Sequence, residues 1–258
     1  MTNCLNCGAS VTGSFCSACG QPVRSRLTLL GVFRSSFLAF FDSDSGFLAT
    51  LFGLFRNPGR LASRYVSGVT VPYVHPARYL IVAIAALQIT IGLTGGISDF
   101  AKGFVEATGD LENLTQAQED SNELFENYLF VVLLLGLPLT AAFQRLVFWS
   151  SGRNFVEHFV CLTYVYAQQL VVINLLLVTD ALLPAPPVDI LTLLFLLVPS
   201  IYYAWTLVVF NTARLFTGSL KALLMLLIST FVNAVVVAFV LGIIRGMRNA
   251  ASANVALI

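Results

Sequence analysis

Four of the five cysteines lie near the start of the 258-residue chain, and their spacing is that of metal ligands. They form two CxxC pairs separated by the eight residues GASVTGSF, namely Cys4, Cys7, Cys16 and Cys19. Each CxxC turn presents two thiolates to one ion, and a tetrahedral zinc ion accepts four such ligands. The sequence therefore predicts a Zn²⁺ site made of these four side chains.

The same pattern favours a structural metal over a catalytic one. A catalytic zinc keeps an open coordination position, whereas four cysteines close the shell. A segment this small has no hydrophobic core, so metal binding would supply most of its folding free energy. Gly8 and Gly20 follow the second cysteine of each pair, where positive φ lets backbone N–H groups turn toward sulfur. Disulfides would need an oxidising compartment, which the topology predicted below does not provide.

The segment between the two pairs argues against nucleic acid as a partner. It has no lysine or arginine and one aromatic residue, Phe15. Recognition of a phosphate backbone needs basic side chains. Contact with a protein, or a purely structural cap, is favoured instead.

A second candidate site consists of His75, Arg78, Glu157 and His158. All four are predicted near the cytoplasmic membrane face, the first pair before the first span and the second pair at the start of the third. They could cap and join helix ends. Alternatively, they could converge within a few ångströms and form a small polar site that binds a lipid headgroup.

The predicted span interiors carry amides in place of ionisable groups. Gln168, Gln169 and Asn174 lie in the third predicted span. They could form interhelical hydrogen bonds of about 1 kcal/mol each, or line an intramembrane polar cavity. Ion-coupled carriers usually place a carboxylate at membrane depth, and the chain has no recognisable protease or hydrolase motif. We therefore expect no enzymatic activity.

Composition identifies the elements that must position these residues. Hydrophobic residues make up 57% of the chain and charged residues 10%, and the mean hydropathy is +0.85. Soluble domains carry about 25% charged residues, and disordered chains have low hydrophobicity. The sequence predicts an all-α polytopic membrane protein, with the lipid bilayer as its main surroundings.

Five apolar runs approach or exceed the length of about 20 residues that a helix needs to cross a bilayer. They lie at residues 79–97, 128–149, 159–179, 190–210 and 222–244. We assign the chain to a zinc ribbon at 1–23, interfacial amphipathic helices at 24–75 and a transmembrane bundle at 76–250. An acidic loop at 99–127 joins the first two spans.

The distribution of basic residues predicts the orientation. Seven arginines precede the first span, whereas the 99–127 loop has one lysine and eight acids. Because basic residues favour the cytoplasmic side, we expect a cytoplasmic N-terminus and an external acidic loop. Arg245 and Arg248 run against this pattern, since five spans place the C-terminal tail outside.

Short motifs extend from the ribbon into the first span. They are Cys19–Gly20–Gln21, Asp44, Ser45, Gly46, Thr50, Arg56, Pro58, Gly59, Tyr65, Gly68, Pro72, Tyr73, Pro76 and Tyr79, with Glu157–His158 further on. In these residues the chain resembles an uncharacterised family of bacterial inner-membrane proteins with an N-terminal zinc ribbon, a domain of unknown function. Its five-span plan is also loosely similar to that of Yip1-type membrane-trafficking proteins. The resemblance implies a multi-pass protein of the cell inner membrane and no known reaction.

These observations together predict a membrane adaptor or scaffold whose ribbon contacts a cytoplasmic protein partner. The alternative is a carrier or channel for a lipid or a small uncharged solute, and an enzyme acting on lipids is the weakest reading. A wet cavity lined by the three amides would favour transport, whereas a sealed apolar bundle would favour the adaptor.

Overall fold

The computed structural model describes residues 2–23, 28, 30–31, 46–94, 127–182 and 188–255. Apart from Asn127, the acidic loop expected at 99–127 lies outside these residues. Most of residues 24–45, the first part of the interfacial region expected at 24–75, also lies outside them. The elements below therefore belong to the ribbon, the second half of the interfacial region and the bundle.

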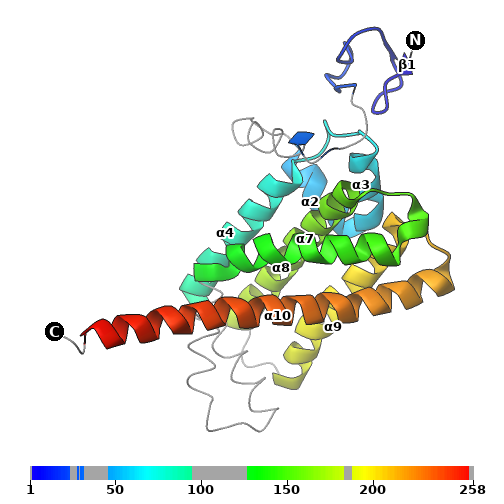
Figure 1. Cartoon of the computed structure of the whole chain (residues 1–258). Helices are drawn as coiled ribbons and strands as arrows, with labels where there is room; N and C mark the ends of the chain where they lie inside the picture. Colours follow the sequence, from blue (N-terminus) through cyan, green and yellow to red (C-terminus); the bar gives the residue numbers. More distant parts are fainter. Residues whose placement is uncertain are drawn as a thin grey trace.

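The described residues form seven α-helices, one 3-10 turn and a two-stranded ribbon (Figure 1). The helices are α2 (Phe47–Arg56), α3 (Pro58–Val66), α4 (Pro76–Thr94), α7 (Leu129–Val147), α8 (Phe155–Leu182), α9 (Val188–Phe210) and α10 (Leu215–Val255). The 3-10 turn is η2 (Trp149–Ser151), and the strands are β1 (Thr2–Asn3) and β2 (Ser10–Val11). The prediction of an all-α membrane protein with an N-terminal cysteine ribbon is confirmed.

Five of these helices are long and apolar enough to cross a membrane, as predicted. The candidate spans are Pro76–Thr94, Leu129–Val147, Phe155–Leu182, Leu193–Phe210 and Leu215–Met247. The largest difference from the prediction is in the fifth span, which starts before Lys221 and not after it. Lysine is a good helix former whose aliphatic stem can lie along apolar surface, so it does not end the helix.

Helices α4 and α8 lie side by side and run in the same direction. The Tyr164 hydroxyl of α8 donates to the carbonyl of Val74 at 2.5 Å, just before α4 begins. Near the other end of α4, the Thr90 hydroxyl donates to Oδ1 of Asn174 at 2.6 Å. Because residue numbers rise in the same direction along both helices between these contacts, the N-terminal ends of α4 and α8 lie at the same end of the bundle.

The other spans reach the same end through their turns. The chain passes from α7 to α8 through η2 and Gly152, whose φ of +69° favours glycine. Arg153 then donates through Nε to the carbonyl of Phe210 at 3.0 Å, which places the last residue of α9 there. The Lys221 ammonium of α10 lies 5.7 Å from the Phe148 ring centroid. We call this the ribbon end of the bundle, because the ribbon contacts the chain there.

Helix α3 is held tightly against the bundle at the ribbon end. A Cβ atom on Gly59 would lie 2.7 Å from the carbonyl oxygen of Thr206 and 2.8 Å from the backbone nitrogen of Phe210, so only glycine permits this approach to α9. Ala62, one turn further along the same face of the helix, is fully buried. The interfacial region thus packs against the bundle through its second half.

The ends of α3 agree with the sequence. Pro58 is its first residue, and the Asn57 side chain caps it by accepting a hydrogen bond from the backbone N–H of Arg60 at 3.1 Å. Gly68 follows the last turn with a φ of +108°. Proline at the first helical position and glycine after the last turn are the usual signals for the start and end of a helix.

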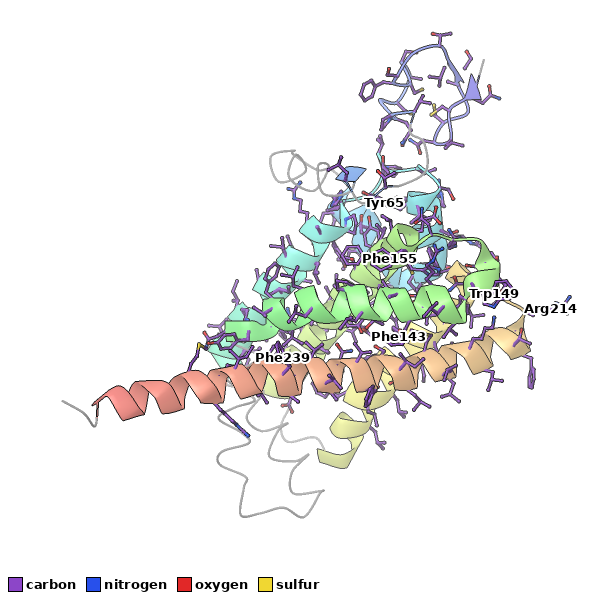
Figure 2. The ribbon with its side chains drawn as sticks, viewed as in Figure 1. Tyr65, Phe143, Trp149, Phe155, Arg214 and Phe239 are labelled. Atoms are coloured by element: carbon purple, nitrogen blue, oxygen red, sulfur yellow. The ribbon has the colours of Figure 1, made fainter. Side chains whose placement is uncertain are left out.

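The spans expose many large apolar side chains. Phe143, Trp149 and Phe239, labelled in Figure 2, are 41%, 78% and 61% exposed. A bundle in water would bury more of this surface, whereas one in lipid has no need to. Helix α10 also extends beyond its neighbours toward the C-terminus (Figure 1).

Candidate functional site

The sulfur atoms of the four ribbon cysteines come together in space. Sγ of Cys4 lies 3.6 Å from that of Cys19, Sγ of Cys7 lies 3.6 Å from that of Cys16, and all four lie within 4.8 Å of one another. Tetrahedral zinc–thiolate bonds of about 2.3 Å would place sulfurs about 3.8 Å apart, whereas a disulfide bond is about 2.05 Å long. The arrangement therefore fits four ligands of one metal ion, and not two disulfides.

The two halves of the ribbon repeat one backbone pattern. In the first half, the Cys4 N–H donates to the carbonyl of Ala9 at 2.8 Å, and the Gly8 N–H donates to the carbonyl of Cys4 at 2.9 Å. In the second half, the Cys16 N–H donates to the carbonyl of Gln21 at 2.8 Å, and the Gly20 N–H donates to the carbonyl of Cys16 at 2.9 Å. Gly8 and Gly20 have φ values of +79° and +71°, as their positions predict. Each half is a knuckle that turns two thiols toward the common centre.

The thiols differ in how readily they lose a proton. The backbone N–H of Cys7 stabilises the Cys4 thiolate and lowers the pKa of Cys4 to about 6. At Cys7 the backbone N–H of Ala9 also favours the thiolate, but the sulfurs of Cys19 and Cys16 outweigh it and raise the pKa of Cys7 to about 12. Four thiolates this close repel one another, so a bound cation is needed for all of them to be deprotonated.

Gln21 fastens the ribbon to the bundle. Its side chain is 3% exposed. Oε1 accepts hydrogen bonds from the backbone N–H groups of Thr70 at 3.1 Å and Val71 at 3.2 Å, while Nε2 donates to the carbonyl of Gly68 at 2.5 Å and to Oγ1 of Thr70 at 3.2 Å. The loop between α3 and α4 is thus held by both polar atoms of one amide. In the sequence, only the Cys19–Gly20–Gln21 motif marks this residue.

The predicted polar site lies at the ribbon end, where two of its members act locally at helix starts. Nδ1 of His75 accepts from the backbone N–H of Ala77 at 3.3 Å, at the beginning of α4. Glu157 accepts from the Asn154 N–H at 2.8 Å and donates its own N–H to the Asn154 side chain at 2.8 Å. This reciprocal pair is a capping box at the start of α8. These contacts support the capping interpretation.

The other two predicted members are placed differently. His158 is fully buried and packs edge-on against Phe210, with ring centroids 5.8 Å apart. Arg78 lies half-buried in the first turn of α4. Whether all four residues converge on one ligand stays a prediction.

Arg153, which the sequence does not single out, connects three helices at this end. Besides its bond to α9, its guanidinium donates to Oγ of Ser63 in α3 at 2.6 Å. It also lies 4.0 Å from the ring centroid of Phe210, within the range of a cation–π contact. A single arginine before α8 therefore holds α3 and α9 together.

The three amides of the third span contact two different helices. The Tyr79 hydroxyl of α4 donates to Oε1 of Gln168, and Asn174 accepts from α4 as described above. Gln169 instead donates to the carbonyl of Pro199 in α9 at 3.0 Å. These contacts are interhelical hydrogen bonds, the first of the two roles predicted for the amides.

Other buried polar groups lack partners among the described residues. They include Oγ1 of Thr140, both polar atoms of the Gln144 amide and both ring nitrogens of His158. All three side chains are 0% exposed. Thr140 and Gln144 share a face of α7, and His158 follows one turn into the antiparallel α8. Buried polar atoms without partners are costly, so these side chains stand out among the buried polar groups of the bundle.

Comparison with known proteins places one segment of the chain in a described family model. Residues 44–87 match DUF3667, a protein family of unknown function. No curated protein and no solved structure matches the chain. The DUF3667 segment covers α2, α3 and much of α4, together with the loop that Gln21 holds. The ribbon lies outside the matched residues.

Proposed function

We propose that this protein is a non-enzymatic membrane adaptor whose metal-bound ribbon presents a contact surface to a protein partner. The observation that carries the proposal is the fixed attachment of the ribbon: Gln21 binds it to the α3–α4 loop by four hydrogen bonds. A ribbon held at one end of a membrane bundle offers its remaining surface in a defined position.

The exposed surface of the ribbon includes an aromatic side chain, Phe15. Phe15 is 66% exposed, although its backbone is fixed by a β-bridge to Pro22. Exposed aromatic side chains on rigid backbone are typical centres of protein interfaces. Zinc is the metal we propose, because four thiolates in a closed tetrahedral set are its usual structural ligands. We place the ribbon in the cytoplasm on the basis of the basic residues near the spans. The bacterial inner membrane is the location that the resemblance in the ribbon and first-span motifs implies.

Site-specific photocrosslinking tests the adaptor proposal. A benzoylphenylalanine at exposed Ser14 should give a discrete crosslinked product in cells, and the same group at Leu93, 81% exposed at the other end of α4, should not give that product. The Ser14 product should be lost in Phe15→Ser and in Cys16→Ser/Cys19→Ser. If the product persists in both variants, the ribbon surface does not bind the partner.

The unpartnered polar groups favour a second candidate, a carrier for a small uncharged solute. Its test is solute-driven swelling of proteoliposomes that contain the purified protein. A carrier should show flux that Thr140→Val/Gln144→Leu abolishes. If wild type and variant both leave the vesicles as impermeable as empty ones, the carrier is excluded and the adaptor stands.

A further inference from the structure

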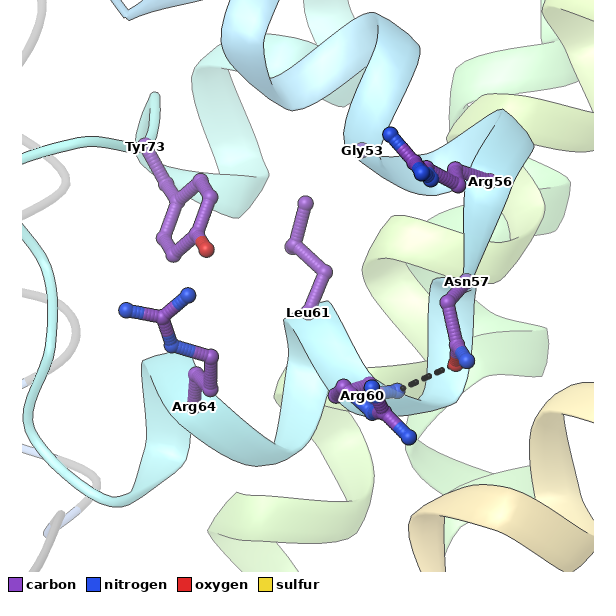
Figure 3. Close-up of a pocket in the computed structure, with 7 residues that line it drawn as sticks. All are labelled: Gly53, Arg56, Asn57, Arg60, Leu61, Arg64 and Tyr73. Carbon is purple, nitrogen blue, oxygen red and sulfur yellow. Dashed lines mark hydrogen bonds between the residues drawn. The ribbon is translucent and has the colours of Figure 1, made fainter.

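We propose that α2 and α3 form a binding site for the phosphate group of an anionic phospholipid. A pocket of about 350 Å³ lies between these helices and the loop that follows them. Arg56, Arg60 and Arg64 line it, and Tyr73 lies beside Arg64, across from Arg56 and Arg60 (Figure 3). The site is separate from the cysteine cluster and goes beyond the adaptor function.

None of the residues that line this pocket is acidic. Between Asp44 and Asp99 the chain has four arginines and neither aspartate nor glutamate. In the described part of the chain, none of the three pocket arginines forms an ion pair; the Arg64 guanidinium lies over the Tyr73 ring at 5.9 Å from its centroid. Guanidinium groups bind phosphate oxygens in pairs, with both charge and geometry matched. An anion is therefore the ligand that the pocket fits.

The neighbouring surface indicates that this anion belongs to a lipid. Leu48, Phe52 and Phe55 lie on one face of α2 and are 62%, 64% and 42% exposed. Arg56 follows directly on the same helix. An apolar helix face bordered by basic side chains inserts at the depth of the lipid headgroups. A phospholipid whose phosphate group lies in the pocket would thus place its acyl chains beside these apolar side chains. A free phosphate would make no contact with them.

The scaffold of the pocket is rigid before any ligand binds. Gly59 fixes α3 against α9, and Arg153 ties Ser63 of the same helix to the bundle. The Asn57 cap sets the angle between α2 and α3 (Figure 3). The arginine side chains therefore project from a fixed backbone, which reduces the entropy lost on binding.

The test is a titration of the full-length protein in non-ionic detergent with water-soluble dihexanoyl phosphatidylglycerol. Dihexanoyl phosphatidylcholine and glycerol 3-phosphate serve as comparison probes. We expect the phosphatidylglycerol to bind at least about tenfold more tightly than either comparison probe, because it combines net negative charge with acyl chains. Equal affinity for the two lipids would overturn the proposal.

Variants assign the binding to this pocket. Arg60→Gln/Arg64→Gln should weaken phosphatidylglycerol binding about tenfold or more, and both substituted side chains are exposed, so the buried face of α3 stays intact. Arg145→Gln/Arg214→Gln is the matched control, since it removes two exposed arginines at the same end of the bundle (Arg214 is labelled in Figure 2), and it should change binding less than about twofold. If the two variants behave alike, the binding is unspecific surface attraction and the site does not exist.

A second variant separates lipid from free phosphate. Phe52→Ser/Phe55→Ser should weaken binding of the phosphatidylglycerol and leave glycerol 3-phosphate unaffected. If glycerol 3-phosphate binds as tightly as the lipid and this variant changes neither, the ligand is a soluble phosphate compound, and the lipid assignment is wrong. Partner crosslinking at Ser14 is read out independently, so failure here leaves the adaptor proposal untouched.

Discussion

At the scale of single residues, the ribbon depends on a few side chains whose roles differ in how well sequence predicts them. The cysteine spacing is a local signal, and it predicted the four-sulfur cluster correctly. The anchoring role of Gln21 was not predictable, because its partners Gly68 to Val71 lie 47 to 50 residues further along the chain. A hydrogen bond over that separation exists only once the helices have packed.

Replacement of Gln21 by alanine should release the ribbon from the bundle. The loss removes the acceptor of the part-buried N–H groups of Thr70 and Val71, at a cost of about 0.5–1.5 kcal/mol per hydrogen bond. Amide hydrogen exchange at these two residues should therefore accelerate at least about tenfold, while the four cysteines remain in place and still bind metal, with lower affinity. Gln21→Glu keeps the acceptor oxygens and should preserve more of this protection. Unaltered exchange in Gln21→Ala would show that the observed bonds do not hold the loop.

Metal affinity of the ribbon should rise with pH. In the metal-free ribbon the pKa of Cys7 is raised to about 12, so this thiol is protonated at neutral pH and must lose its proton on binding. Each such thiol adds about one unit of log affinity per pH unit. Cys4, with a pKa lowered to about 6, adds to this slope only below that pH. Competition with a chelator of known pH dependence measures the slope, and a flat profile between pH 6 and 8 would contradict thiolate ligation.

At the scale of elements, apolar run length predicted the number of spans, whereas their ends depended on tertiary contacts. The fifth span is the clearest case, since Lys221 stays inside α10 beside the Phe148 ring. The packing of α3 on α9 was also not predictable, because the close approach at Gly59 involves backbone atoms near residue 206, far along the chain. Pro58 and Gly68 were predictable because start and stop signals are local.

Alanine at position 59 should separate α3 from α9. Its Cβ would lie under 3 Å from backbone atoms that cannot rotate away, and such overpacking costs typically about 1–3 kcal/mol. We expect a lower thermal unfolding midpoint for the purified protein in detergent. Gly92→Ala is the control, because nothing lies within 4 Å of a Cβ there; it should leave the midpoint unchanged or slightly raised. Equal midpoints for the two variants would contradict the tight contact.

At the scale of the whole molecule, the parallel run of α4 and α8 fits a chain that crosses the membrane at each of its five long helices. The distribution of basic and acidic residues among the loops predicts which end of the bundle faces the cytoplasm. The packing of the helices against one another does not indicate this orientation. Orientation depends on the membrane and the insertion machinery, and not on contacts between helices.

Reporter fusions should show the ribbon end in the cytoplasm. A green fluorescent protein joined after Thr212, between α9 and α10, should fluoresce, whereas alkaline phosphatase joined there should be inactive. After Gly109 in the acidic loop the pattern should reverse. The opposite pattern at both positions would place the ribbon outside, where the cysteines would meet an oxidising environment.

The position of Gln21 would couple a metal ion bound by the four cysteines to the packing of the helices. Its backbone carbonyl accepts from Cys16 in the second knuckle, while its side chain grips the loop between α3 and α4. Thermodynamic linkage is reciprocal. If metal binding raises the equilibrium constant for docking of the ribbon by some factor, docking raises the metal affinity by the same factor. Any event that pulls this loop away, inside the DUF3667 segment, must therefore loosen the ion by the same factor. The metal affinity of the ribbon, in the aqueous phase, and the packing of the α3–α4 loop, at the membrane, should therefore change together.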